Sequence, residues 1–167
     1  MAGPEYDDFY AAMWPRLVRT AYAVSGDLGI AEDSAQIALA KAYRSWRRIS
    51  KVDAPEAYVR RMTVNEVLNH LRRASSRRES ARDDLPDQAL VADDPTVVHD
   101  EMWRAVLALP PRQRAVLVLR YYEDLTEQEI ADALGCRPGT VKSQASDALA
   151  SLRHRFDADS RAEKETR

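Results

Sequence analysis

The chain has 167 residues, of which 45% are hydrophobic and 31% charged, and its formal net charge at pH 7 is −2. It has no run of about 18 apolar residues, which excludes a membrane-spanning helix, and its opening MAGPEYDDFY lacks the apolar core of a secretory signal peptide. The single cysteine, Cys136, excludes an internal disulfide and a cysteine-cluster zinc site, and we expect no metal or other cofactor in a chain that works in the reducing cytoplasm.

Helical spacing of apolar residues runs through the first half of the chain. We predict helices on both sides of Pro15, because proline removes a backbone donor and breaks a helix interior. A long helix is predicted over residues 30–49, with Tyr43 on its inner, apolar face. After the loop at residues 50–55, the spacing predicts a third helix near residues 55–73.

The middle of the chain is strongly basic and then strongly acidic. Residues 41–82 carry twelve basic and four acidic residues, net +8, whereas residues 83–101 carry seven acidic residues and no basic one. A basic segment with aromatic residues suits single-stranded nucleic acid; the alternatives are a solvated basic face and, for Trp46 and Tyr58, a place in the core. The periodicity disappears over residues 74–95, which predicts a flexible acidic linker between two helical domains.

The second half has the layout of a helix-turn-helix (HTH). In DLTEQEIADALG, Thr126 and Glu129 have the spacing of a capping box, and Gly135 can take the left-handed conformation that ends a helix. Pro138 suits the first turn of a last helix, which we expect to reach about Phe156. In an HTH this last helix enters the major groove of DNA. The residues on or beside its outward face are Arg137, Lys142, Ser143, Gln144, Ser146 and Asp147.

The charge of this HTH is unfavourable for DNA. Residues 123–147 contain six acidic and only two basic residues, whereas DNA affinity depends largely on basic side chains at phosphates. Either the helix pair is purely structural, or another part of the chain or a partner shares the binding.

The two halves together resemble the extracytoplasmic-function (ECF) sigma factors, the smallest sigma subunits of bacterial RNA polymerase. WPRLVRTAYAVSGDLGIAEDSAQIALAKAYRSW is similar to the first part of the family's region 2, and APEAYVRRMTVNEVLNHLRR to its promoter-melting part. LPPRQRAVLVLRYYEDLTEQEIADALGCRPGTVKSQASDALASLR resembles region 4. The resemblance implies an all-α chain that is not an enzyme. It implies region 2 at residues 1–73, a linker at 74–95, region 4 at 96–156 and a charged tail at 157–167.

The resemblance also implies roles for particular residues of region 2. Asp33 and Gln36 match the pair with which the family docks on the polymerase clamp, although Ile37 and Leu39 stand where the family usually has an acidic residue and phenylalanine. The loop at residues 50–53 matches the place where the family holds an unstacked base of the −10 element. The residues expected to contact the −10 strands are Asn65, Asn69, Arg60, Arg61, Arg72 and Arg73.

In region 4, the outward set from Arg137 to Asp147 matches the positions with which the family reads the −35 element. Gln144 and Asp147 stand where relatives tend to be basic. Asp147 either accepts a hydrogen bond from cytosine or only faces solvent.

The partners implied by the resemblance are core RNA polymerase, through its clamp and flap, and promoter DNA, as a duplex at −35 and single-stranded at −10. An anti-sigma factor is a common partner in the family. We expect the acidic linker to avoid duplex DNA and to occupy the polymerase's basic interior, so neutralising its aspartates should impair initiation. Two other readings stay open: a free-standing HTH regulator that binds duplex DNA, and a helical adaptor that binds only protein.

Overall fold

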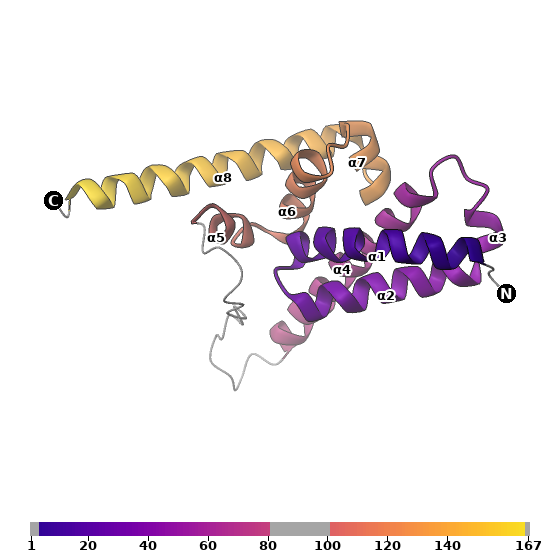
Figure 1. Cartoon of the computed structure of the whole chain (residues 1–167). Helices are drawn as coiled ribbons and strands as arrows, with labels where there is room; N and C mark the ends of the chain where they lie inside the picture. The colour runs from indigo at the N-terminus through magenta and orange to yellow at the C-terminus, as the bar shows by residue number, and fades with distance from the viewer. Residues whose placement is uncertain (1–3, 81–100, 166–167) are drawn as a thin grey trace. The chain divides into compact units, whose positions relative to one another are not determined.

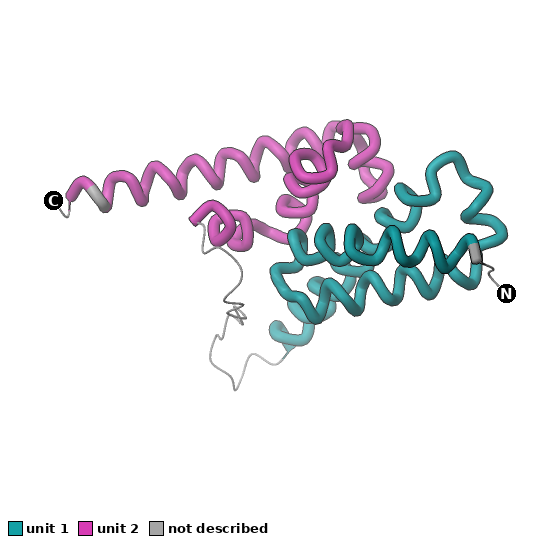
Figure 2. Tube along the Cα trace, viewed as in Figure 1, with its two compact units in different colours: residues 1–93 teal, residues 94–167 magenta. Residues whose placement is uncertain are grey.

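The structure is a computed structural model in which residues 4–80 and 101–165 are described (Figure 1). All regular structure in these residues is helical, which confirms the predicted all-α fold class. The chain divides into two compact units, Met1–Asp93 and Asp94–Arg167 (Figure 2). Each unit has its own hydrophobic core.

The described residues of the first unit, 4–80, form four helices: α1 (Pro4–Ser25), α2 (Leu28–Arg44), α3 (Trp46–Ile49) and α4 (Pro55–Ser80). The three long helices pack against one another. Asp27 fixes the start of α2, because its side chain accepts a hydrogen bond from the Ile30 backbone N–H at 2.9 Å. The buried residues between the helices include Met13, Leu17, Leu39, Ile49 and Val59.

Helix α1 runs through Pro15 without interruption, so the predicted break there is wrong. Proline costs the helix one backbone hydrogen bond and crowds the preceding turn. Met13 and Leu17, on either side of it, are both buried in the same core. Because a break would turn one of these side chains away from the core, packing along the whole helix outweighs the local preference of proline.

The predicted long helix over residues 30–49 is divided at Ser45, which has φ −112° and ψ 17°. The change of direction buries both Trp46 and Ile49 in α3, so Trp46 belongs to the core. Tyr43 is 44% exposed, and its predicted place on the inner face is wrong. The buried face of α2 includes Ala42, and the next residue along a helix is turned by about 100° from it.

Helices α4 and α8 (Pro138–Glu165) are longer than predicted. Residues 74–80 and 157–165 contain no glycine or proline, and their alanine, arginine and glutamate residues extend an existing helix at little cost. The first seven residues of the predicted linker and most of the charged tail are therefore helical. The rest of the linker, with the aspartates assigned to it, lies outside the described residues.

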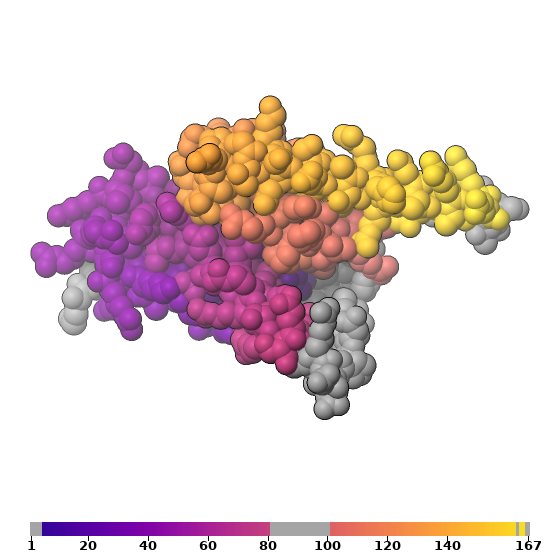
Figure 3. Space-filling model, turned by 180° about the vertical axis from the view of Figure 1, so that it is seen from behind, coloured from indigo at the N-terminus to yellow at the C-terminus, as the bar shows by residue number. Residues whose placement is uncertain are grey.

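The second unit contains α5 (Glu101–Leu107), α6 (Pro111–Leu117), the π-helix η1 (Val118–Tyr122), α7 (Glu127–Leu134) and α8. Leu109, Leu117 and Ala148 are buried together, with Leu149 and Leu152 packed against them. Helices α6 and η1 follow one another without a break and include the stretch RQRAVLVLRYY. Figure 3 shows the atoms of α8 as a continuous strip, from orange to yellow, that runs past the other helices of its unit.

Candidate nucleic-acid interface

The turn between α7 and α8, which sets the direction of α8, is formed as the sequence predicts. Thr126 Oγ1 accepts a hydrogen bond from the Glu129 backbone N–H, and Glu129 Oε2 accepts one from the Thr126 N–H at 2.7 Å, which completes the capping box. Gly135 ends α7 at φ 64° and ψ 40°, and Cys136 N–H donates to the Ala131 carbonyl at 3.0 Å. These contacts fix the direction in which α8 leaves α7.

Two arginines of α6, which the sequence patterns did not single out, join this helix to the ends of its neighbours α7 and α5. Arg112 Nη2 donates to the Leu134 carbonyl, at the end of α7, at 3.2 Å. Arg114 is buried, and its Nη1 donates to the Leu107 carbonyl, at the end of α5, at 2.6 Å. Burial lowers the pKa of the Arg114 guanidinium. Their only sequence signal is the Pro-Pro-Arg-Gln-Arg run, which does not say which carbonyls the side chains reach.

Helix α8 presents a polar outer face. Val141, Ala145 and Ala148 are buried against the unit, and the residues predicted to point outward are exposed: Arg137, Lys142, Ser143, Ser146 and Asp147. Gln144 is half-buried, and its Oε1 is enclosed with no hydrogen-bond donor within reach among the described residues. The structure thus places Lys142, Ser143, Ser146 and Asp147 together on one exposed face of α8, whereas Arg137 is exposed just before the helix begins and Gln144 is half-buried beside that face.

The acidic residues of α7 are largely engaged in the helix itself. The Glu129 carboxylate caps its N-terminus, and the Asp132 carboxylate accepts a hydrogen bond from Gln128 Nε2 at 3.0 Å. Two of the six acidic residues that seemed unfavourable for an HTH therefore make hydrogen bonds within the supporting helix, whereas Arg137 and Lys142 lie at the start of the last helix.

In the first unit, α4 arranges most of the predicted −10 residues along one side. Arg61, Asn65, Asn69 and Arg72 follow one another at spacings of four, four and three, so they share a face. Arg72 Nη2 donates to Asn69 Oδ1 at 3.2 Å. Arg73 is exposed beside this face, whereas the half-buried Arg60 lies on the other side of Arg61. The helical extension adds two exposed arginines, Arg77 and Arg78.

The predicted docking residues Asp33 and Gln36 are exposed on α2. Ile37 lies beside them and is 44% exposed, whereas Leu39 is buried and its carbonyl accepts a hydrogen bond from the Tyr6 hydroxyl at 2.7 Å. Of the two apolar residues that depart from the family pattern, only Ile37 lies on this surface.

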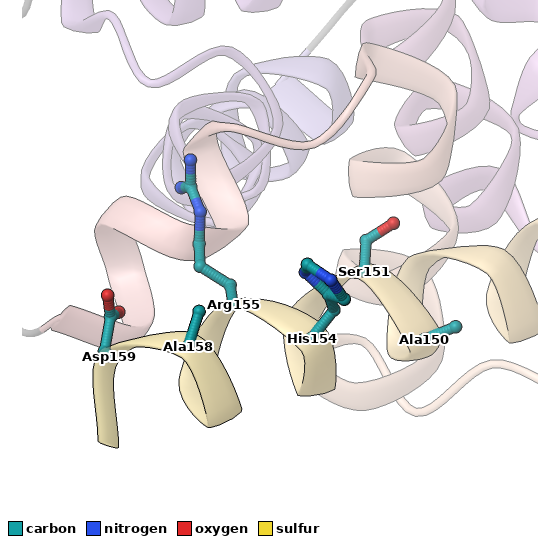
Figure 4. Close-up of a pocket in the computed structure, with 6 residues that line it drawn as sticks. All are labelled: Ala150, Ser151, His154, Arg155, Ala158 and Asp159. Atoms are coloured by element: carbon teal, nitrogen blue, oxygen red, sulfur yellow. The ribbon is translucent and has the colours of Figure 1, made fainter. Parts of the chain in front are cut away.

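Other kinds of site find little support in the described residues. A groove beside α8 is lined by side chains of that one helix, among them His154, Arg155 and Asp159 (Figure 4). Small-molecule sites enclose most of their ligand, and a groove lined by a single helix does not have that form. In residues 4–80 and 101–165, no three histidine, cysteine or acidic side chains gather as metal ligands. No described helix is long and apolar enough to cross a membrane.

Comparison with known proteins matches both units to one family. Residues 9–77 match the model for sigma-70 region 2, and residues 99–152 match the model for sigma-70, region 4. The RNA polymerase sigma-E factor of Streptomyces coelicolor is 36% identical over 166 residues, which cover 95% of this chain and 91% of that protein. The ECF RNA polymerase sigma factor SigE of Mycolicibacterium smegmatis is 32% identical over 86% of this chain and 58% of its own length.

The fold is also similar to that of a solved sigma factor. RpoE of Bartonella quintana, solved in complex with the anti-sigma factor NepR, aligns with a TM-score of 0.73 over 94% of this chain and 99% of that one. The two sequences are 20% identical, so this likeness concerns the fold.

Proposed function

The chain belongs to the ECF group of the sigma-70 family, and from that premise we propose that it binds core RNA polymerase and directs initiation at promoters with a −35 and a −10 element. The observation that carries the proposal is the presence of two differently built surfaces in one chain. One is the exposed face of α8 around Lys142, whose HTH setting suits duplex DNA. The other is the face of α4 from Arg61 to Arg72, which suits opened strands.

Each surface takes part in a different step of initiation. Arg137 and Lys142 provide phosphate contacts, and Ser143, Ser146 and Asp147 lie where side chains reach base edges of the −35 element. Asn65, with its amide, and the arginines of α4 hold the −10 strands after they separate. Asp33, Gln36 and Ile37 on α2 dock on the polymerase clamp. The chain contributes binding only, and the polymerase forms every bond of the transcript.

Tethering accounts for the modest charge of the HTH. Once the first unit is bound to polymerase, the second unit meets the −35 element as an intramolecular event, so its effective concentration is high. A weak individual contact is then sufficient. We place this activity in the cytoplasm, where polymerase and chromosome are found, and the complex known for the Bartonella quintana relative makes an anti-sigma factor the kind of regulator to expect.

Transcription in vitro with purified core polymerase tests the proposal against its rivals. With a sigma factor, core polymerase starts transcripts at defined promoters on linear DNA. A free-standing regulator would need a second sigma factor in the reaction before any promoter was used. A protein adaptor would bind polymerase without dependence on DNA sequence. Absence of promoter-specific transcripts with saturating protein would refute the proposal.

A further inference from the structure

The loop between α3 and α4 is short and open to solvent. Its residues 50–54 are all exposed, and Val52 is 37% exposed. The loop starts from the end of α3, where Lys51 N–H donates to the Arg48 carbonyl at 3.2 Å, and it ends at Ala54, whose carbonyl accepts from Tyr58 N–H at 3.1 Å. The resemblance to ECF sigma factors implies that an unstacked base of the −10 element is held at residues 50–53, and the inference below rests on that role within the proposed function.

One side-chain pair joins the two ends of this loop. Arg48 Nη2, from α3, donates to the Tyr58 hydroxyl, on α4, at 3.2 Å. The Arg48 guanidinium also lies over the Tyr58 ring, 5.8 Å from its centroid, a cation–π arrangement. The pair therefore bridges the chain just before and just after the loop.

Both partners are supported by the core of the first unit. Tyr58 packs its ring against the buried cluster, and Arg48 belongs to α3, which is fixed by the buried Trp46 and Ile49. A contact between two anchored residues restrains the loop between them more than a contact between two mobile surface side chains would.

We propose that Arg48 and Tyr58 are positioning residues that set the width of the loop at residues 50–54, and with it the choice of base held there. The rival explanation for Arg48 is a direct contact with a DNA phosphate, as its charge alone would suggest. The two explanations differ in what they require of Tyr58: positioning needs its hydroxyl, whereas a phosphate contact does not.

The test uses the full chain with core polymerase, on promoter templates that differ only in the base at the captured −10 position. Promoter opening is followed by permanganate reactivity of unpaired thymines, and binding of a −35 duplex is measured separately. The variants are Tyr58→Phe, which removes only the hydroxyl, and Arg48→Ala. Arg47→Ala is the matched control, because Arg47 is an exposed neighbour in α3 for which the described residues show no contact with Tyr58.

Tyr58→Phe removes the hydrogen bond but keeps the ring under Arg48, so we expect it to reduce discrimination among the four bases by about two- to fivefold, the factor for one exposed hydrogen bond. Arg48→Ala removes both the hydrogen bond and the cation–π contact and should reduce discrimination by at least as much. The double variant should lose little more than Arg48→Ala, because both changes break the same bridge. Binding of the −35 duplex should be unchanged, and Arg47→Ala should keep the wild-type base preference.

Wild-type discrimination in Tyr58→Phe, together with weaker opening and a smaller salt dependence in Arg48→Ala, would overturn the proposal in favour of the phosphate contact. Equal opening of all four templates by the wild-type chain would overturn it as well. Absence of opening on every template, with polymerase active with another sigma factor, would instead refute the proposed function beneath it.

Discussion

Lys142 is an exposed basic residue near the start of α8. If it contacts a phosphate of the −35 element, its removal should weaken binding to every sequence alike, because phosphate contacts carry no base information. We expect Lys142→Ala to reduce the slope of log affinity against log salt by about 0.9, the value for one phosphate contact.

The measurement is a salt titration of holoenzyme binding to a −35 duplex. Lys164→Ala is the matched control, because it removes the same charge from an exposed position on the same helix, more than five turns further along. An unchanged slope in Lys142→Ala, or an equal change in both variants, would show that Lys142 does not contact the backbone.

Tyr6 gives a prediction about pH. Burial, and then the nearby Tyr10, Asp7 and Tyr43, raise the pKa of its hydroxyl above the ordinary value, and the hydroxyl donates to the Leu39 carbonyl. The folded state therefore holds this proton more tightly than the unfolded state does. The stabilisation that the protonated Tyr6 hydroxyl gives to the folded state is complete below the pKa of an unfolded tyrosine, about 10. This stabilisation decreases as the pH rises above that value.

We expect Tyr6→Phe to lower the free energy of unfolding by about 1 kcal/mol at pH 7, the value of a typical hydrogen bond. The difference from the wild type should shrink above about pH 10, where ionisation in the unfolded state favours unfolding of the wild type only. Urea unfolding of both proteins at several pH values measures it. A gap that stays constant up to pH 11 would contradict the assignment.

At the scale of elements, the two glycines around the HTH turn have opposite requirements. Gly135 has φ 64°, a backbone that disfavours a side chain by roughly 1–2 kcal/mol, even though nothing lies within 4 Å of an added Cβ. Gly139 also has open space, but it is the second residue of α8, where the backbone is helical and alanine fits without strain; the preference for alanine is about 1 kcal/mol in a helix interior and smaller in this first turn.

Gly135→Ala should therefore lower the free energy of unfolding of the second unit by about 1–2 kcal/mol, and Gly139→Ala should raise it by up to about 1 kcal/mol. Thermal or urea unfolding of the full chain measures both. Both substitutions add the same methyl group. Equal changes in the free energy of unfolding would therefore mean that backbone conformation does not decide the effect of the substitution.

The sequence predicted those elements whose signal is local. The capping box at Thr126, the left-handed Gly135 and the start of α8 at Pro138 each depend on a few neighbouring residues, and all three were correct. The break at Pro15 was wrong because its outcome depends on burial of Met13 and Leu17 by other helices. Such packing partners are distant in sequence and leave no local pattern.

The same distinction applies to the candidate surfaces. Helical spacing was sufficient to place Lys142, Ser143 and Ser146 on one exposed face. It gave no sign that Arg112 reaches the Leu134 carbonyl or that Arg48 bridges to Tyr58. These contacts join different helices, so only the folded arrangement reveals them. Leu39, which departs from the family's docking pattern, lies on the α2 face that meets the core and is buried.

At the scale of the molecule, charge is divided between the units. The net +8 of residues 41–82 lies in the first unit, whereas residues 102–156 of the second carry eight basic and six acidic residues, net +2. The second unit therefore has too little positive charge to hold DNA strongly by itself, and we expect it to act while it is joined to polymerase through the first unit. Specificity then depends on both promoter elements together.

Mapping the 5′ ends of transcripts made in vitro from genomic DNA tests this account most directly. Core polymerase is compared with and without the protein, under otherwise equal conditions. We predict a new set of start sites that share a −35 and a −10 element at a constant spacing, and loss of these starts when either element is altered. An unchanged set of starts, or starts that depend on only one element, would contradict the account.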